Sequence, residues 1–128
     1  MALLGEFLPA KGLPLSDLER IRHPVEALLW NHAARLLQLG VNVILDNGFW
    51  TRADREDYRA RGAAAGARTQ LHFLDVPADV LLARLDERNR ELPPGVFWID
   101  PVWMRDWIRI FEPPSEEELI PRDARPVI

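Results

Sequence analysis

The chain has 128 residues, of which 48% are hydrophobic and 28% are charged, and its net charge is −4. This length fits one globular domain that buries roughly two-thirds of its unfolded surface. The absence of cysteine excludes disulfide frameworks, thiolate metal sites and cysteine nucleophiles. No apolar run approaches the ~20 residues of a membrane span, and no basic run suits duplex nucleic acid, so we expect a cytoplasmic protein that binds neither.

Hydrophobic spacing and capping residues predict alternating helices and strands. Ser16 and Glu19 have the spacing of a capping box, and Pro24 suits the first turn of a second helix. The elements expected after it are helices over 25–39, 51–65, 77–89 and 100–111, and strands over 41–46 and 68–75. Short joins between them favour parallel strands linked by right-handed crossovers. The predicted fold class is therefore α/β.

The C-terminal third contains less regular sequence. Residues 91–98 predict an irregular loop, and the aromatic residues of the helix that follows have the spacing of a packed face, not of a base-stacking platform. Residues 115–118 form an acidic turn, and residues 121–128 read as a loose tail. We accordingly predict one domain over residues 1–118 and a C-terminal tail over 119–128.

The basic residues are unusual because Lys11 is the only lysine among 16 lysines and arginines. The phosphate-binding loop G-x-x-x-x-G-K-[ST] needs a lysine to reach the β- and γ-phosphates and a following hydroxyl to hold magnesium. Lys11 is followed by Gly12 and Leu13, and no strand precedes it. The sequence therefore contains no such loop.

Four blocks, in this order, resemble the AAA-type ATP-binding proteins of the P-loop kinase superfamily, a group similar to chloramphenicol phosphotransferase and zeta toxin. They are residues 43–52 (VILDNGFWTR), 71–77 (LHFLDVP), 84–89 (RLDERN) and 111–114 (FEPP). The resemblance covers about residues 25–118. It implies an ATP-dependent phosphotransferase that uses ATP and Mg²⁺ and phosphorylates a small molecule or a nucleotide.

The resemblance also implies roles for individual residues. Asp46, at the end of a predicted strand, matches an acidic residue near magnesium and the phosphates, although a strand-end aspartate can also simply cap the next turn. Arg84 and Arg88 match arginines that neutralise phosphates beside a mobile lid. Acidic partners for these two arginines are the structural alternative, because like charges four residues apart on a helix repel.

The loop after the first predicted strand supplies the candidate substrate pocket. Its candidate residues are Asn47, Phe49, Trp50 and Arg52, since open α/β sheets bind ligands beyond the ends of their strands. Alternatively, the two aromatic side chains simply pack beneath the lid. Arg55, Arg59 and Arg61 alternate with acidic residues and predict a solvated helix face.

The chain departs from the family at its beginning. The family pattern starts with a strand, the phosphate-binding loop and a segment carrying the probable base, so Met1 resembles an internal methionine of a longer, N-terminally truncated protein. The expected fold is then an incomplete P-loop-kinase-like parallel sheet flanked by helices. Such a chain is expected to be inactive alone and to self-associate through exposed strand edges. The alternative is a non-enzymatic binding or oligomerising remnant.

Overall fold

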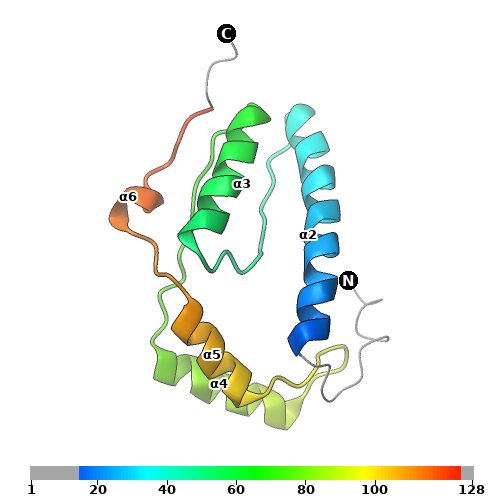
Figure 1. Cartoon of the computed structure of the whole chain (residues 1–128), viewed down its shortest axis with the longest axis vertical. Helices are drawn as coiled ribbons and strands as arrows, with labels where there is room; N and C mark the ends of the chain where they lie inside the picture. Colours follow the sequence, from blue (N-terminus) through cyan, green and yellow to red (C-terminus); the bar gives the residue numbers. More distant parts are fainter. Residues whose placement is uncertain (1–14, 125–128) are drawn as a thin grey trace. The chain divides into compact units, whose positions relative to one another are not determined.

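The computed structural model describes residues 15–124, with side chains from Arg20 onward. Five helices lie in this range: α2 (Leu15–Gln38), α3 (Arg52–Ala64), α4 (Ala78–Glu91), α5 (Pro101–Ile110) and α6 (Glu116–Leu119) (Figure 1). The chain divides into two compact units. The first unit contains residues 75–110 with the chain up to Arg20, and the second contains residues 21–74 with the chain from Phe111 onward.

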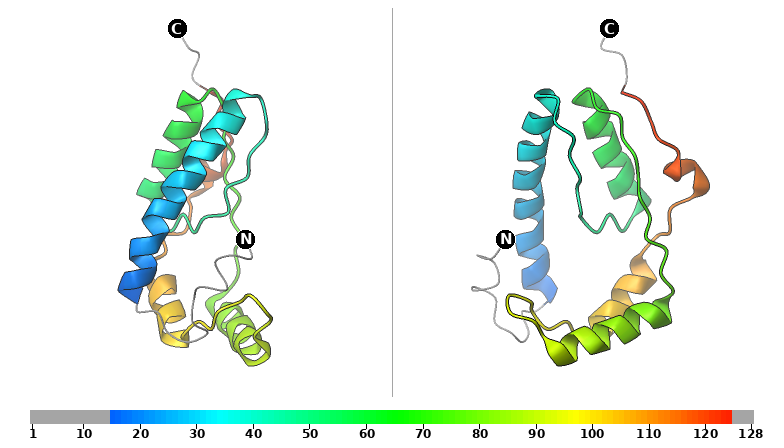
Figure 2. Two further views of the ribbon diagram at one scale, coloured as in Figure 1. Left: turned by 90° about the vertical axis from the view of Figure 1, so that its right-hand side faces the viewer. Right: turned by 180° about the vertical axis from the view of Figure 1, so that it is seen from behind.

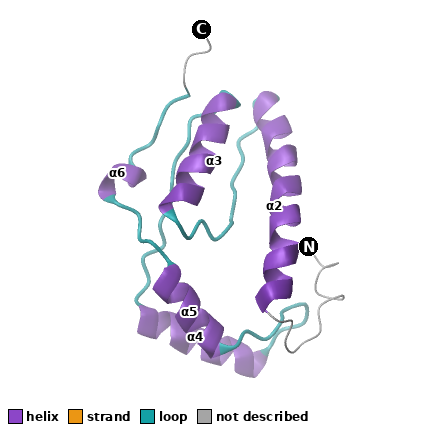
Figure 3. Cartoon of the chain, in the orientation of Figure 1, coloured by secondary structure: helices purple, strands orange, loops and turns teal. Residues whose placement is uncertain are grey.

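The predicted parallel sheet is wrong. No residue of the described range lies in a strand (Figure 3), and the predicted strands over 41–46 and 68–75 are loop segments that do not pair with each other. One antiparallel bridge, between Thr69 and Arg122, is present there. A strand requires a neighbour about 4.7–4.9 Å away to accept its ladder of hydrogen bonds. These β-rich residues have no such ladder, so their preference for strands is not enough to form one.

The predicted helices are present, with one change near the N-terminus. The break expected before Pro24 does not occur, because α2 continues through this residue. Proline there removes one backbone donor from the helix interior. The capping box predicted at Ser16 and Glu19 depends on side chains outside the described part. α2 ends at Gln38, and Gly40 just beyond it has a left-handed φ of 78°; Val41 N–H donates to Leu36 O at 3.0 Å in a Schellman arrangement.

In the second unit, long side chains link α2 to α3, which are drawn next to each other in Figures 1 and 2. The rings of Trp30 on α2 and Tyr58 on α3 meet edge to face, with centroids 5.6 Å apart. The Arg61 guanidinium lies over the Tyr58 ring at 4.8 Å and over the Trp30 ring at 5.8 Å. Burial raises the pKa of the Tyr58 phenol, and Glu26 adds to this effect. The interface therefore depends on aromatic and cation–π contacts.

A buried ion pair joins α3 to α6 within the same unit. The side chains of Arg55 and Glu118 are each only 2% exposed, and Arg55 Nε donates to Glu118 Oε1 at 2.8 Å. Arg59 donates to the backbone carbonyl of Glu118 and, at 2.8 Å, to that of Ile120. The prediction that Arg55 and Arg59 lie on a solvated face is therefore wrong. They share a stripe of α3 with Gly62, and all three residues are buried; Arg55 and Arg59 bind the returning C-terminal segment.

The chain after α6 is also bound to α3, although the sequence predicts a loose tail. Arg122 donates to both carboxylate oxygens of Glu56, at 2.6 and 2.7 Å. This hydrogen bond lowers the pKa of Glu56 despite the opposing effect of burial. The backbone of Arg122 exchanges hydrogen bonds with Thr69 at 2.8 and 2.9 Å. Residues up to Arg122 are thus held by both backbone and side-chain bonds.

The first unit centres on the contact between α4 and α5. Leu85 is its buried apolar side chain, at 4% exposure. Asn89, near the end of α4, uses its amide to hold the segment before α5: Nδ2 donates to Ile99 O at 2.6 Å, and Oδ1 accepts from Ile99 N–H at 3.2 Å. Asp100 then caps α5 by accepting from Val102 N–H at 2.8 Å. These bonds fix both ends of the loop over 92–100.

Candidate functional site

The loop that follows Asp46 is tightly constructed. Asp46 is exposed and Asn47 is half-buried. Phe49 has a φ of 44°, in the left-handed region that non-glycine residues rarely adopt. Strain of this kind is maintained only where the surroundings fix the backbone, and it clusters at functional sites. The backbone of this loop is therefore determined by its contacts.

Three hydrogen bonds to the backbone of the loop supply this restraint. Arg55 Nη1 donates to Phe49 O at 3.0 Å, and Glu112 N–H donates to Trp50 O at 2.8 Å. In return, Glu112 Oε2 accepts from Arg52 N–H at 2.9 Å. The FEPP block at residues 111–114 thus holds the loop of the first block in place. Arg52 and Glu112, which form one of these bonds, are 60 residues apart in the sequence. Phe111 also stacks on Phe73 of the second block, with ring centroids 5.8 Å apart.

Both aromatic residues of the loop are in contact with the helices of the second unit. The Phe49 ring meets Tyr58 edge to face at 5.0 Å, and the Arg22 guanidinium lies 5.4 Å from the centre of the Trp50 ring. Thr51 Oγ1 accepts from Asp54 N–H at 3.1 Å and begins α3, as the sequence predicts. These contacts anchor the loop between two helices. Asp46 and Arg52 are exposed, whereas Asn47, Phe49 and Trp50 are half-buried.

Gly48 cannot be replaced without disturbing the candidate site. A Cβ atom at this position would collide with the indole ring of Trp50. We expect Gly48→Ala to lower the free energy of unfolding by about 1–3 kcal/mol, the usual cost of overpacking. Urea unfolding measures the loss. Ala60→Ser, at an exposed position of α3, is the control and should stay within about 0.5 kcal/mol of the parent; an equally small loss in Gly48→Ala would contradict the predicted collision.

The two arginines predicted to bind phosphate lie on α4 in the first unit, and their surroundings differ. Arg84 is exposed. Arg88 is half-buried, its Nη1 atom is buried without a hydrogen-bond partner, and its guanidinium lies 5.9 Å from the centre of the Phe97 ring. In the described part, no acidic side chain pairs with either arginine, whereas the neighbouring Arg90 binds Asp86 at 3.2 Å. The alternative of acidic partners therefore finds no support among these residues.

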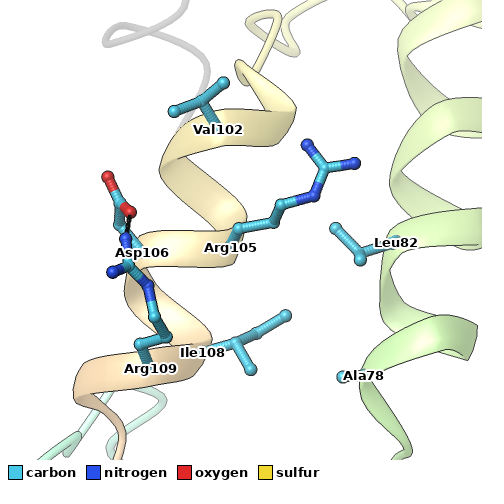
Figure 4. Close-up of a pocket in the computed structure, with 7 residues that line it drawn as sticks. All are labelled: Ala78, Leu82, Val102, Arg105, Asp106, Ile108 and Arg109. Atoms are coloured by element: carbon cyan, nitrogen blue, oxygen red, sulfur yellow. Dashed lines mark hydrogen bonds and ion pairs between the residues drawn. The ribbon is translucent and has the colours of Figure 1, made fainter.

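An open groove of about 470 Å³ lies between α4 and α5 of the same unit (Figure 4). Its walls are mainly apolar, and Arg105, Asp106 and Arg109 lie along α5 at its edge. Arg109 is bound to Asp106, as the dashed line in Figure 4 shows. The groove is open to solvent and carries none of the residues that the sequence singles out. It is therefore a surface feature of the α4–α5 pair.

Few side chains of the described residues are arranged to bind a metal ion. Among residues 15–124, no group of three or more histidine or carboxylate side chains could hold a metal ion. Magnesium, however, is commonly bound by one or two carboxylates together with water and substrate phosphates. The exposed carboxylate of Asp46 fits such a limited role. Independent binding of a metal by protein side chains alone does not fit the described residues.

Arg55, Arg59 and Glu118 are the important residues that sequence reasoning misses. Arg55, Arg59 and Gly62 recur at four- and three-residue steps, the spacing of a buried helical face, and this signal is visible in the sequence. The partners of the two arginines lie about 60 residues further along the chain, so the sequence does not reveal which residues they pair with. Through Arg55, the ion pair reaches the candidate site, because the same guanidinium holds Phe49 O.

Comparison with known proteins places these residues in a family. A family model described as "AAA domain" matches residues 6–96, which is more than half of the chain. The chain therefore belongs to this AAA-domain family, a group of P-loop NTPase-like, kinase-type proteins. The match includes Asp46, the loop after it, Arg84 and Arg88. No curated protein and no solved structure matches the chain, and no helix of the described residues is long and apolar enough to cross a membrane.

Proposed function

We propose that this chain contributes acceptor-binding and lid residues to ATP-dependent phosphoryl transfer onto a small molecule or a nucleotide. Family membership supports nucleotide-linked phosphate chemistry. The single observation that carries the proposal is the buried Nη1 atom of Arg88, which has no hydrogen-bond partner. A buried donor on a charged group is costly unless an acceptor binds it. A phosphate oxygen is an acceptor of the right charge.

The proposed roles follow from position and exposure. Arg88 and Arg84, one helical turn apart, bind phosphate oxygens of the nucleotide. In the second unit, Asp46 would hold a water ligand of a nucleotide-bound magnesium ion, which neutralises phosphate charge. Asn47 and Arg52 contact the acceptor, while Phe49 and Trp50 form the wall of its pocket and fix the loop. Phosphoryl transfer depends on positioning and electrostatics, which are the two properties this loop and these arginines supply.

The 128-residue sequence lacks the G-x-x-x-x-G-K-[ST] pattern, so the affinity of this chain for ATP is expected to be weak and its catalysis negligible. Isothermal titration with ATP and magnesium measures this affinity. Arg88→Gln should weaken it about tenfold, equivalent to one charge-assisted hydrogen bond of about 1.4 kcal/mol. Asp46→Asn should reduce the magnesium dependence of binding while leaving magnesium-free binding unchanged.

Arg90→Gln is the matched control, because Arg90 lies on the same helix but is exposed and paired with Asp86. It should bind ATP as the parent does. Equal losses in the two arginine variants would show only a general effect of charge, and an unchanged affinity in Arg88→Gln would refute the proposed role. Tight, magnesium-dependent binding by the parent chain would contradict the expected weak affinity for ATP.

A second candidate function is a non-enzymatic binding or oligomerising module. Ile44 is 93% exposed and Leu74 is 87% exposed, although both occur in β-rich apolar segments. The proposal for this candidate is that a partner covers these two side chains. This candidate is compatible with the first, because the two rest on different residues.

A further inference from the structure

The segment over residues 69–74, in the second unit, has the side-chain alternation of a strand without the pairing of one. Leu71 and Phe73 are half-buried, and Phe73 stacks on Phe111. Gln70, His72 and Leu74 are exposed. Alternation with period two is the pattern of a strand that packs on one face only. The segment is therefore held in an extended form by contacts of its odd-numbered residues.

One edge of this segment is already occupied. Thr69 exchanges both of its backbone hydrogen bonds with Arg122, at 2.8 and 2.9 Å. In an antiparallel pair, the residues between such bonded positions direct their N–H and C=O groups to the opposite edge. Gln70, His72 and Leu74 thus present their backbone groups away from Arg122. No backbone bond to these three residues is found within the described range, so this edge can accept a strand.

We propose that residues 69–74 pair in antiparallel orientation with the same residues of a second copy of this chain. The pairing places His72 opposite His72 across a two-fold axis and Gln70 opposite Leu74. In this register the free backbone groups of all three residues find partners, since each is in a hydrogen-bonded position. A two-fold interface uses the same patch on both copies, and this edge complements itself.

Charge selects the antiparallel orientation and favours a second copy as the occupant. Arg68 precedes the segment and Asp75 follows it; both are exposed, and Arg68 also lies 3.5 Å from Asp123 in a surface ion pair that leaves its guanidinium largely in solvent. Antiparallel pairing brings the Arg68 end of one copy toward the Asp75 end of the other, whereas parallel pairing would bring like charges together. The exposed Leu74 side chains are partly covered by the neighbouring strand. This inference is independent of the phosphotransferase proposal, because it involves neither Asp46 nor the α4 arginines.

Sedimentation equilibrium of the intact chain tests the pairing. The parent should form a reversible dimer, and Leu74→Lys should weaken dimerisation at least about tenfold, because it places a charge where the neighbouring strand partly covers Leu74. Val102→Lys is the matched control: Val102 is 57% exposed but lies on α5 in the first unit, and its dimer should be as strong as the parent's. Circular dichroism checks that both variants keep the parent's helix content.

The absence of cysteine allows a second, direct test. His72→Cys should form a disulfide-linked dimer on mild oxidation, since opposed residues of a bonded pair have Cα atoms about 5.5 Å apart, within disulfide range. Val102→Cys should remain uncrosslinked. A parent chain that stays monomeric, a Val102→Lys loss equal to that of Leu74→Lys, crosslinking through Val102→Cys instead, or unlimited aggregation in place of a dimer would each overturn the proposal.

Discussion

Replacing Glu118 with glutamine is expected to lower the free energy of unfolding of the second unit by about 3–5 kcal/mol. The change keeps the size of the side chain and leaves an amide oxygen that can still accept from Ser115 N–H, a bond of 2.9 Å in the parent. It removes the negative charge beside Arg55, whose side chain is 2% exposed. The cost is therefore that of a buried, unpaired guanidinium. Urea unfolding followed by circular dichroism measures it.

Glu117→Gln provides the comparison. Its carboxylate lies 3.9 Å from Arg52 and its side chain is 77% exposed, so loss of this surface pair should cost less than about 1 kcal/mol. Similar losses in the two variants would show that the buried pair contributes no more than a surface pair. A Glu118→Gln protein as stable as the parent would contradict the importance of the Arg55–Glu118 contact.

The same variant should change the response to acid. The hydrogen bond from Arg55 lowers the pKa of Glu118 to about 2, although burial acts in the opposite direction. An unfolded glutamate binds its proton at a higher pH than this, so the ion pair contributes its full stability above about pH 4.3 and loses it as the pH falls through about 2. Melting temperatures between pH 5 and pH 2 should fall less steeply in Glu118→Gln than in the parent.

The sequence predicts the helices of this chain well because their signals are local. Thr51 caps α3 by a bond to a residue three positions away, and the left-handed glycine at position 40 ends α2 through bonds within one turn. The strands over 41–46 and 68–75 depend on a neighbour elsewhere in space, and local preference cannot supply one. Pro24 is a local signal that predicts wrongly, because a helix of 24 residues tolerates the loss of one backbone donor.

The sequence proposes candidate site residues, but it does not predict the contacts that hold them in place. The loop residues Phe49, Trp50 and Arg52 are held by Arg55 and Glu112, and the family resemblance includes the blocks of the loop and of Glu112 without showing that they meet. The acidic residues that alternate with Arg55 along α3 favour a solvated position for it. Its burial depends instead on Glu118, which is 63 residues away. Charge pattern within one helix cannot reveal a partner at that separation.

The first unit depends most on Leu85, and Leu85→Ala is expected to destabilise it by about 2–5 kcal/mol. Among the described residues only Ala33 and Leu85 are fully buried apolar side chains. On the same face of α4, Leu85 is buried, whereas Leu81 and Leu82 are half-buried. A cavity at Leu85 therefore removes the centre of the α4–α5 contact.

Hydrogen exchange of the α4 and α5 amides is the appropriate measurement, because it reports on this unit separately from the other. Leu82→Ala is the matched control: the same atoms are removed one turn earlier on the same helix, from a half-buried side chain that lines the open groove. Its amides should exchange with protection closer to that of the parent, since part of the deleted surface is already in water. Equal loss of protection in both variants would mean that packing is spread evenly along α4, and that Leu85 has no special place in it.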